Sequence, residues 1–150
     1  MLRDIVQTYE HLSDDGRATV TFRDETMGAG LLVRGREGPL GQVFRNLIDN
    51  AISFSPDGGE VLVTLRQGAD GPQTIAEILI EDSGPGIPDD KLEKIFERFY
   101  TDRPAGAAFG NNSGLGLSIV KQIIETHQGS VTASNRESGG ALFKVLLTAT

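Results

Sequence analysis

Residues 79–88 read LIEDSGPGIP, so two glycines and two prolines follow directly after a run of apolar residues. The residues before them, 75–82 (IAEILIED), alternate and then run apolar, which is typical of a half-buried strand that ends at the edge of a core. The pattern predicts that Asp82 lies at a strand terminus and faces a pocket or solvent. Asp-Ser-Gly is also ordinary turn chemistry, so this stretch alone is compatible with a purely structural turn.

The composition limits the class of protein. The chain has 150 residues, 38% hydrophobic and 23% charged, which is enough for one compact core and short for two. It has no cysteine, which excludes disulfides and thiolate metal sites, and no apolar run near the length of a membrane span. The net charge of −7 argues against a nucleic-acid surface, because phosphate backbones are bound by clustered Lys and Arg. An anionic ligand would need a metal ion or backbone N–H groups to offset the repulsion.

Hydrophobic periodicity and turn residues predict a mixture of helices and strands. Helices are expected at 2–12, 40–54, 89–99 and 115–127, with Pro39 in the first turn of the second and Gly129 closing the last. Strands are expected at 18–22, 31–33, 60–65, 75–82, 131–134 and 141–147, with a polar loop, QGADGPQ, before 75–82. Because strands do not alternate strictly with helices, the order predicts an α+β fold with helices on one face of a sheet.

The helix expected at 40–54 carries two asparagines one turn apart. Its apolar residues form one stripe, while Asn46, Asn50 and Ser53 share another. Asparagine is a poor helix former because its amide competes for backbone hydrogen bonds. The pair is therefore either part of a solvated face or part of a site. The uncharged oxygen of Asn suits a Mg²⁺ ion whose other ligands are phosphates and waters.

The start of the last long helix has the composition of an anion site. In SGLGLSIVKQIIETH (113–127), Gly114 and Gly116 stand where the apolar helix begins. The first N–H groups of a helix lack intrahelical partners, and the helix dipole favours a phosphate there. A close packing contact would explain the glycines equally well. The stretch is neither a GxxxxGK[ST] phosphate loop nor the G-x-G-x-x-G of a dinucleotide fold.

The order of the motifs is more specific than any one of them. It runs NLIDNA (46–51), DSGPGI (82–87), FERFY (96–100), SGLGL (113–117) and SGGALF (138–143). In this order, over residues 2–147, the chain resembles the ATP-binding catalytic domain of sensor histidine kinases, within the superfamily that includes gyrase, chaperone and mismatch-repair ATPases. The resemblance implies a two-layer α/β sandwich of the Bergerat type, with a mixed sheet backed by helices on one face, and ATP and Mg²⁺ as cofactors.

The resemblance also implies roles for individual residues. Asp82 would accept a hydrogen bond from the adenine 6-amino group, since a carboxylate only accepts and guanine has a carbonyl at that position. Asn50 would bind magnesium and Asn46 would lie at the phosphates, which makes these two asparagines the candidate catalytic residues. Residues 101–113 would form a mobile lid, with Phe96 and Phe99 packed at its root. The further nucleotide contacts implied are Phe54, Gly84, Gly86, Ile87, Arg103, Gly114, Leu115, Gly116, Leu117 and Phe143.

Three positions depart from the family pattern. Ser53 stands where many of these kinases have a lysine, Asn112 replaces the first glycine of the box around SGLGL, and Ala141 replaces a common threonine. The missing lysine removes a charge that would touch the phosphates, and Arg103 is a candidate to compensate. The other two changes would loosen particular contacts without removing the backbone cradle.

The implied function is to bind Mg-ATP and donate its γ-phosphoryl group to a histidine on a separate dimerisation domain. Neither His11 nor His127 has the acidic and proline neighbours of a phosphoacceptor histidine, so both are expected to be structural. We therefore expect residues 13–150 to be the catalytic domain and 1–12 to be a helix that links to the dimerisation domain. The isolated domain is expected to be a monomer and the full protein a homodimer that signals to a response regulator. The domain is expected to be cytoplasmic, in an inner-membrane sensor kinase.

Rival functions differ in what they require of the same positions. A gyrase- or chaperone-type hydrolase needs a glutamate four residues before the magnesium asparagine, where this chain has Asn46, which cannot act as a general base. An anti-sigma-type serine kinase usually lacks the long lid and the phenylalanine box. A non-catalytic nucleotide-binding regulatory module fits the sequence as well.

Overall fold

The computed structural model describes residues 1–12, 18–26, 28, 31–97 and 116–149. The strands in this part of the chain are β1 (Thr19–Asp24), β2 (Glu60–Asp70), β3 (Gln73–Glu81), β4 (Ser130–Asn135) and β5 (Ala141–Thr148). The helices are α1 (Leu2–Leu12), α2 (Glu37–Phe54) and α3 (Gly116–Thr126), with two short 3-10 helices, η2 (Asp89–Lys91) and η3 (Lys94–Phe96).

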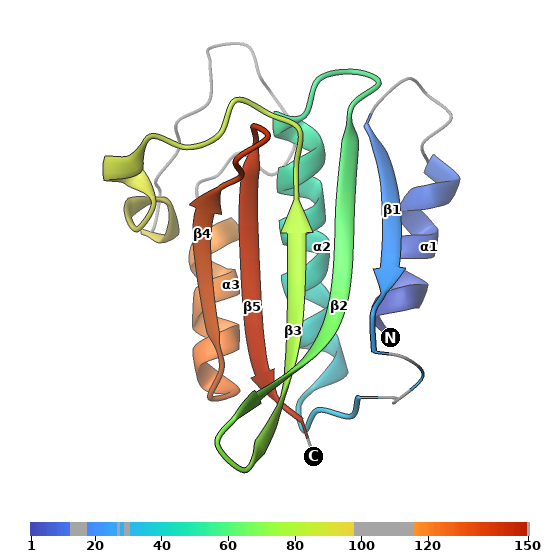
Figure 1. Ribbon diagram of the computed structural model, residues 1–150, viewed down its shortest axis with the longest axis vertical. Coiled ribbons are helices and arrows are strands. Elements are labelled where there is room, and N and C mark those ends of the chain that lie inside the picture. The colour runs from blue at the N-terminus through green and yellow to red at the C-terminus, as the bar shows by residue number, and fades with distance from the viewer. Residues whose placement is uncertain (13–17, 27, 29–30, 98–115, 150) are drawn as a thin grey trace.

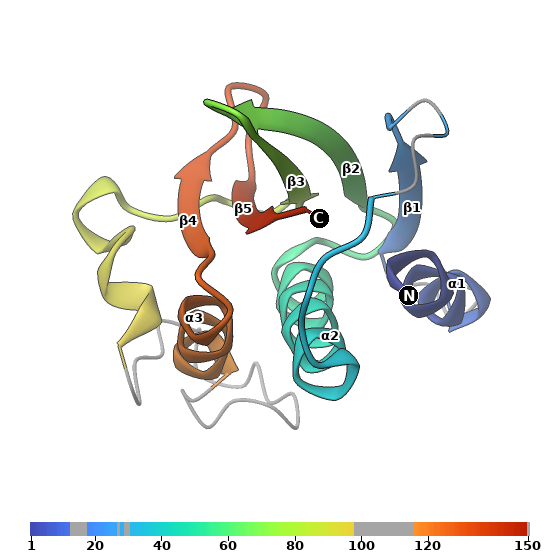
Figure 2. The ribbon, with the colours of Figure 1, turned by 90° about the horizontal axis from the view of Figure 1, so that it is seen from below.

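The strands form one mixed sheet in the order β1-β2-β3-β5-β4 (Figure 1). β1 is parallel to β2, and the other neighbouring strands pair antiparallel. Helices α1, α2 and α3 all lie against the same face of the sheet, as the end-on view in Figure 2 shows. This arrangement is the α+β sandwich, with a mixed sheet backed by helices on one face, that the sequence predicts.

The core lies between the two layers. In β5 the residues Ala141, Phe143, Val145 and Leu147 are buried and alternate with half-buried neighbours, as expected for a strand with one face on a core. The opposing surface is the apolar stripe of α2, whose predicted members are all buried: Leu40, Val43, Phe44, Leu47 and Ala51. The period of 2 in the strand and of 3.6 in the helix therefore explains how the two layers meet.

The prediction of a polar loop at 67–73, between the strands expected at 60–65 and 75–82, is wrong. β2 continues to Asp70 and β3 begins at Gln73, so only Gly71 and Pro72 turn the chain, with Gly71 at φ +58°. An ion pair between Arg66 and Glu77, 2.6 Å apart, links the two strands where they leave the core. This outer part of the hairpin extends beyond the helix layer (Figure 1). It buries little apolar surface there, so its sequence lacks the alternation that reveals a strand.

Three other expected boundaries differ in the structure. The helix expected at 89–99 is instead two short 3-10 helices, η2 and η3, within the part of this segment that the structure describes, up to residue 97. Helix α2 begins at Glu37, three residues early, and Pro39 fits its first turn because no intrahelical N–H bond is needed there. The strand expected at 31–33 is a single bridge from Val33 to Ala149.

Helix α1 is part of the same core. Leu2, Ile5 and Val6 are buried in it, and the Tyr9 hydroxyl donates a 2.7 Å hydrogen bond to Asp49 Oδ1 on α2. Burial, followed by this hydrogen bond, raises the pKa of Tyr9, so the hydroxyl stays a donor. None of the helices among the described residues combines the length and the apolar character needed to cross a membrane.

Candidate nucleotide site

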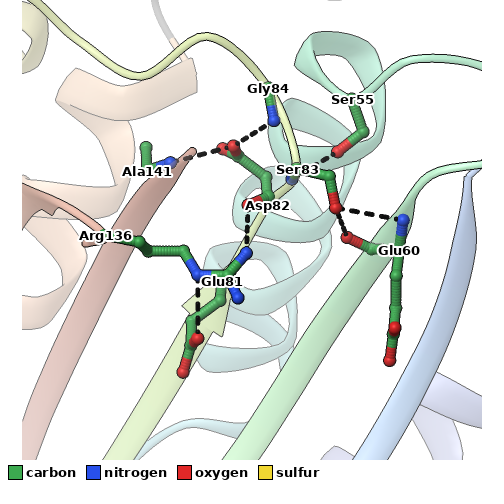
Figure 3. A network of polar contacts seen from close by, with 8 residues as sticks. All are labelled: Ser55, Glu60, Glu81, Asp82, Ser83, Gly84, Arg136 and Ala141. Carbon is green, nitrogen blue, oxygen red and sulfur yellow. Dashed lines mark hydrogen bonds and ion pairs between the residues drawn. The ribbon is translucent and has the colours of Figure 1, made fainter. Parts of the chain in front are cut away.

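Asp82 directly follows β3, at the strand terminus that the sequence predicts. The residue is buried rather than exposed to solvent, with an exposed fraction of only 2%. Oδ1 accepts hydrogen bonds from the backbone N–H groups of Gly84 and Ala141, each at 2.9 Å (Figure 3). Both bonds fall on Oδ1, so within the described part of the chain the second carboxylate oxygen is the one left to accept a hydrogen bond from a ligand.

Burial dominates the electrostatics of this carboxyl group. Desolvation raises the pKa of Asp82 above its ordinary value, while the N–H groups of Ala141 and Gly84 and the charge of Arg136 act in the opposite direction. A buried carboxyl group that offers a fixed acceptor is costly for a fold. Such a group is characteristic of a binding site rather than of a structural turn.

The segment 82–88, here called the nucleotide loop, passes very close to the end of α2. A Cβ atom on Gly84 would lie 2.5 Å from the carbonyl oxygen of Phe54, so only glycine fits there. Gly86 has φ +84°, a conformation that favours glycine. Ser83 N–H donates to Ser55 Oγ at 3.1 Å, which also ties the loop to the residue after α2 (Figure 3).

The β4–β5 turn contacts the nucleotide loop from the other side. Arg136 Nη1 donates to the carbonyl oxygen of Asp82 at 2.6 Å (Figure 3), and Asn135 exchanges two hydrogen bonds with the backbone of Ile87. Sequence reasoning missed both side chains. Their only signal was their position just before the SGGALF motif, which does not show that they reach back to residues more than 45 positions earlier.

The two asparagines of α2 lie one turn apart and are both half-buried. Asn46 Nδ2 donates to the carbonyl oxygen of Gly116 at 3.4 Å, so this asparagine joins α2 to the start of α3. The hydrogen bond uses the amide nitrogen of Asn46 and leaves its oxygen outside the contact. Asn50 lies on the same face, and its backbone carbonyl oxygen accepts a hydrogen bond from Ser53 Oγ at 2.9 Å. A neutral amide oxygen beside a helix start can serve as a metal ligand for Mg²⁺ that is also bound to phosphates.

Among the described residues no group of three or more His, Asp or Glu is arranged to hold a metal ion. A magnesium ion at Asn50 would therefore take its other ligands from a bound molecule and from water. Such a site would depend on the ligand, because a lone amide is a weak magnesium ligand and Mg²⁺ usually keeps several waters.

The apolar residues expected around the ligand are near the core. Ile87 and Leu117 are half-buried and pack against it, and Phe143 is 1% exposed with its ring edge-on to Phe96 at 6.1 Å. Phe143 thus lies beneath the site in the core. Several expected residues lie outside the described part of the chain: Arg103, Gly114, Leu115, Asn112, Phe99 and the lid 101–113.

His127 makes contacts within the fold. Its Nδ1 lies 2.8 Å from the carbonyl oxygen of Ile123, and its Nε2 lies 3.1 Å from the backbone nitrogen of Arg36. Because a carbonyl needs a donor and an N–H needs an acceptor, the ring is the tautomer protonated at Nδ1. It joins the end of α3 to the start of α2, and the cap residue Arg36 has no side-chain cap of its own.

Comparison with known proteins places this geometry in a class. Residues 35–150 match the family described as "Histidine kinase-, DNA gyrase B-, and HSP90-like ATPase". The sensor protein ChvG of Rhizobium meliloti is 45% identical over 117 residues, which are 77% of this chain and 20% of ChvG. The solved structure of the mycobacterial sensor histidine kinase MprB superposes with a TM-score of 0.77 at 30% identity, covering 99% of this chain and 91% of that one.

A third similar protein was solved with a nucleotide analogue bound. Full-length ShkA in complex with AMPPNP superposes with a TM-score of 0.70 at 25% identity, over 99% of this chain and 29% of ShkA. Together, fold and family define an ATPase domain. The chain belongs to the histidine kinase-, DNA gyrase B- and HSP90-like ATPase family. Within it, the chain is similar to the catalytic domains of sensor histidine kinases, and it spans about a fifth of the length of ChvG.

Proposed function

We propose that this chain binds Mg-ATP and donates the γ-phosphoryl group to a histidine on a separate dimerisation domain. The observation that carries the proposal is the carboxyl group of Asp82, buried at a strand end and fixed by the N–H groups of Gly84 and Ala141. It is a preorganised acceptor for the adenine 6-amino group. AMPPNP in the structural neighbour ShkA supports an adenine nucleotide as the ligand.

The same loop and helices supply the rest of the proposed nucleotide contacts. Gly84 and Gly86 let the nucleotide loop bend around the base, while Ile87, Leu117 and Phe143 supply apolar surface on the core side. Phe54 ends α2 directly beside the loop. Gly116 at the start of α3, with Gly114 and Leu115 before it in the sequence, would direct N–H groups at the phosphates, and Arg103 would add a positive charge.

Asn50 is the proposed magnesium ligand, with Asn46 beside it at the phosphates. When bound, the ion would neutralise phosphate charge and help to orient the γ-phosphoryl group for transfer. The part of this chain is to hold the base and the phosphates in line with an external nucleophile. Asn46 stands where a hydrolase of the superfamily has a glutamate and has no proton-accepting side chain, so activation of water is not its task.

The acceptor histidine would come from another domain, since His127 is used within the fold. We propose that the longer protein dimerises through that domain, passes the phosphoryl group to a response regulator and is associated with the inner membrane, with this domain in the cytoplasm. We propose further that α1, besides packing on the sheet, links the catalytic domain to the dimerisation domain, and that the isolated domain is a monomer.

Calorimetry of the isolated chain with ATP and GTP, with and without Mg²⁺, tests the nucleotide part of the proposal. We expect ATP to be preferred, and we expect Asn50→Ala to abolish the gain in ATP affinity that Mg²⁺ provides while binding without Mg²⁺ stays within about twofold. Gln42→Ala, on the exposed side of the same helix, should keep that gain. Equal binding of ATP and GTP would contradict the assignment of Asp82, and an unchanged magnesium effect in Asn50→Ala would remove that residue from the metal site.

A further inference from the structure

The two ends of the nucleotide loop are held by Asn135, the last residue of β4, and by the next residue, Arg136. At one end, Arg136 Nη1 donates to the carbonyl oxygen of Asp82 at 2.6 Å. At the other end, Asn135 Oδ1 accepts from Ile87 N–H and Asn135 Nδ2 donates to the Ile87 carbonyl oxygen, both at 2.7 Å. The loop is therefore held near both of its ends, at Asp82 and Ile87, by two residues that lie about 50 positions later in the sequence.

The contacts of Asn135 replace those of a neighbouring strand. Its amide group satisfies both backbone polar groups of Ile87, as a paired strand residue would, at a point where the loop has left the sheet. A Cβ atom on Gly86 would lie 2.7 Å from Asn135 Oδ1, so the glycine is also what lets the amide approach. The side chain of Asn135 thus fixes the backbone path at the C-terminal end of the nucleotide loop.

Arg136 is itself held in place before it reaches the loop. Its Nε forms an ion pair with Glu81 Oε2 at 3.1 Å, and the residue is half-buried. Its own backbone N–H donates to the Gly140 carbonyl oxygen at 2.9 Å, which closes the turn. One guanidinium group therefore joins a side chain on β3 to the backbone of the next residue, Asp82. A lysine, which has a single ammonium group, cannot reproduce this two-sided contact.

We propose that Asn135 and Arg136 are positioning residues that set how strongly the site discriminates for the adenine 6-amino group. They do so by holding the backbone near both ends of the nucleotide loop. The path of that backbone determines where the second carboxylate oxygen of Asp82 points. The inference rests on the proposed function, because it takes that amino group as the donor to Asp82. Neither side chain needs to touch the nucleotide.

The test compares two ligands that differ only at the contact in question. Purine riboside 5′-diphosphate lacks the 6-amino group of ADP, so the ratio of the two affinities reports the hydrogen bond to Asp82. For the unaltered chain we expect ADP to bind at least about tenfold more tightly, the equivalent of about 1.4 kcal/mol. In Arg136→Met and Asn135→Ala we expect this ratio to fall at least about threefold, because ADP weakens while the analogue changes little.

Two further variants make the result specific. Glu137→Gln, exposed in the same turn, should keep the ratio of the unaltered chain, and Arg136→Lys should give an intermediate ratio. If Arg136→Met does not fold, Asn135→Ala and Arg136→Lys carry the test. Equal weakening of both ligands, or an unchanged ratio, would overturn the positioning role while leaving the adenine contact intact. A ratio near one in the unaltered chain would overturn the adenine contact itself and this inference with it.

Discussion

At the scale of single residues, the buried carboxyl group of Asp82 has a cost to stability as well as its proposed binding role. Its carboxyl group is buried, and that burial raises its pKa above the ordinary value of 3.8. Because the folded-state pKa is raised, the carboxyl group stabilises the fold most below pH 3.8, and this contribution is lost as the pH rises through the folded-state pKa. At neutral pH the fold therefore holds a charge that the unfolded chain would solvate better.

Replacement of Asp82 by asparagine should separate the two effects. The oxygen of asparagine can still accept from Gly84 and Ala141, but the buried charge is gone, so we expect Asp82→Asn to raise the melting temperature at pH 7.5 by about 2–4 °C. Thermal denaturation should show this gain shrinking as the pH falls toward 4. The same variant should bind ADP more weakly by about 1–3 kcal/mol. A gain in stability that does not depend on pH would contradict the account of the buried charge.

Two adjacent glycines offer a matched pair for testing how closely the β4–β5 turn approaches Asp82. Gly139 and Gly140 have φ of +99° and +92°, so alanine is strained at either position. A Cβ atom on Gly139 would meet nothing within 4 Å, whereas one on Gly140 would overlap the backbone carbonyl of Asp82.

We expect Gly139→Ala to lower the free energy of unfolding by about 1–2 kcal/mol. Gly140→Ala should cost about 2 kcal/mol more, because overlap is added to strain. Urea denaturation of both variants measures the difference. Equal losses would show that the turn does not press on Asp82 as described.

At the scale of elements, helices and strands that pack on the core were predicted from the sequence, and segments that lie outside the core were not. The apolar stripe of α2 and the strand at 141–147 were both predicted correctly, and both have a face buried against the opposite layer. The outer half of the β2–β3 hairpin lies beyond that layer, so its strands show no apolar period. The segment containing Ile95 and Phe96 has charged and apolar residues that mimic a helix, while its real shape depends on a contact with Phe143 that is distant in sequence.

The end of α3 shows a similar division between local and tertiary causes. Gly129 was expected to close the helix, yet the residue in the left-handed conformation is Gln128, at φ +57°. The N–H groups of Gln128 and Gly129 bond the carbonyls of Glu125 and Ile124, which is the Schellman arrangement. Gly129 is required for another reason, because a Cβ there would overlap the Leu146 carbonyl oxygen of β5.

We therefore expect Gln128→Gly to stabilise the chain by about 0.5–1 kcal/mol, since glycine adopts positive φ without strain. Gly129→Ala should destabilise it, because the new methyl group has no room against β5. Urea unfolding distinguishes the two positions. A stabilising Gly129→Ala together with a destabilising Gln128→Gly would reverse our assignment of the helix cap.

At the scale of the whole molecule, the chain has the fold of the histidine kinase-, DNA gyrase B- and HSP90-like ATPase family. The motif order allowed the family to be predicted, because each motif is local in sequence, while the ligand contacts expected of Asp82 and Asn50 stay predictions. Asn135 and Arg136 were not predicted, since their role depends on the pairing of β4 with β5 and of β5 with β3, which brings the turn to the nucleotide loop. Long-range pairing of this kind leaves no mark in a single sequence.

The most direct test of the central claim is phosphotransfer from labelled ATP. The chain is incubated with [γ-³²P]ATP, Mg²⁺ and the histidine-bearing dimerisation domain of its own sensor kinase, and the label on each protein is measured. We predict an acid-labile, base-stable phosphohistidine on the dimerisation domain, a strong decrease with Asp82→Asn, no decrease with Gln42→Ala, and slow ATP hydrolysis by the chain alone. Label retained on His11 or His127 of this chain, or rapid ATP turnover without the partner domain, would contradict the proposal that it is the nucleotide-binding half of a histidine kinase.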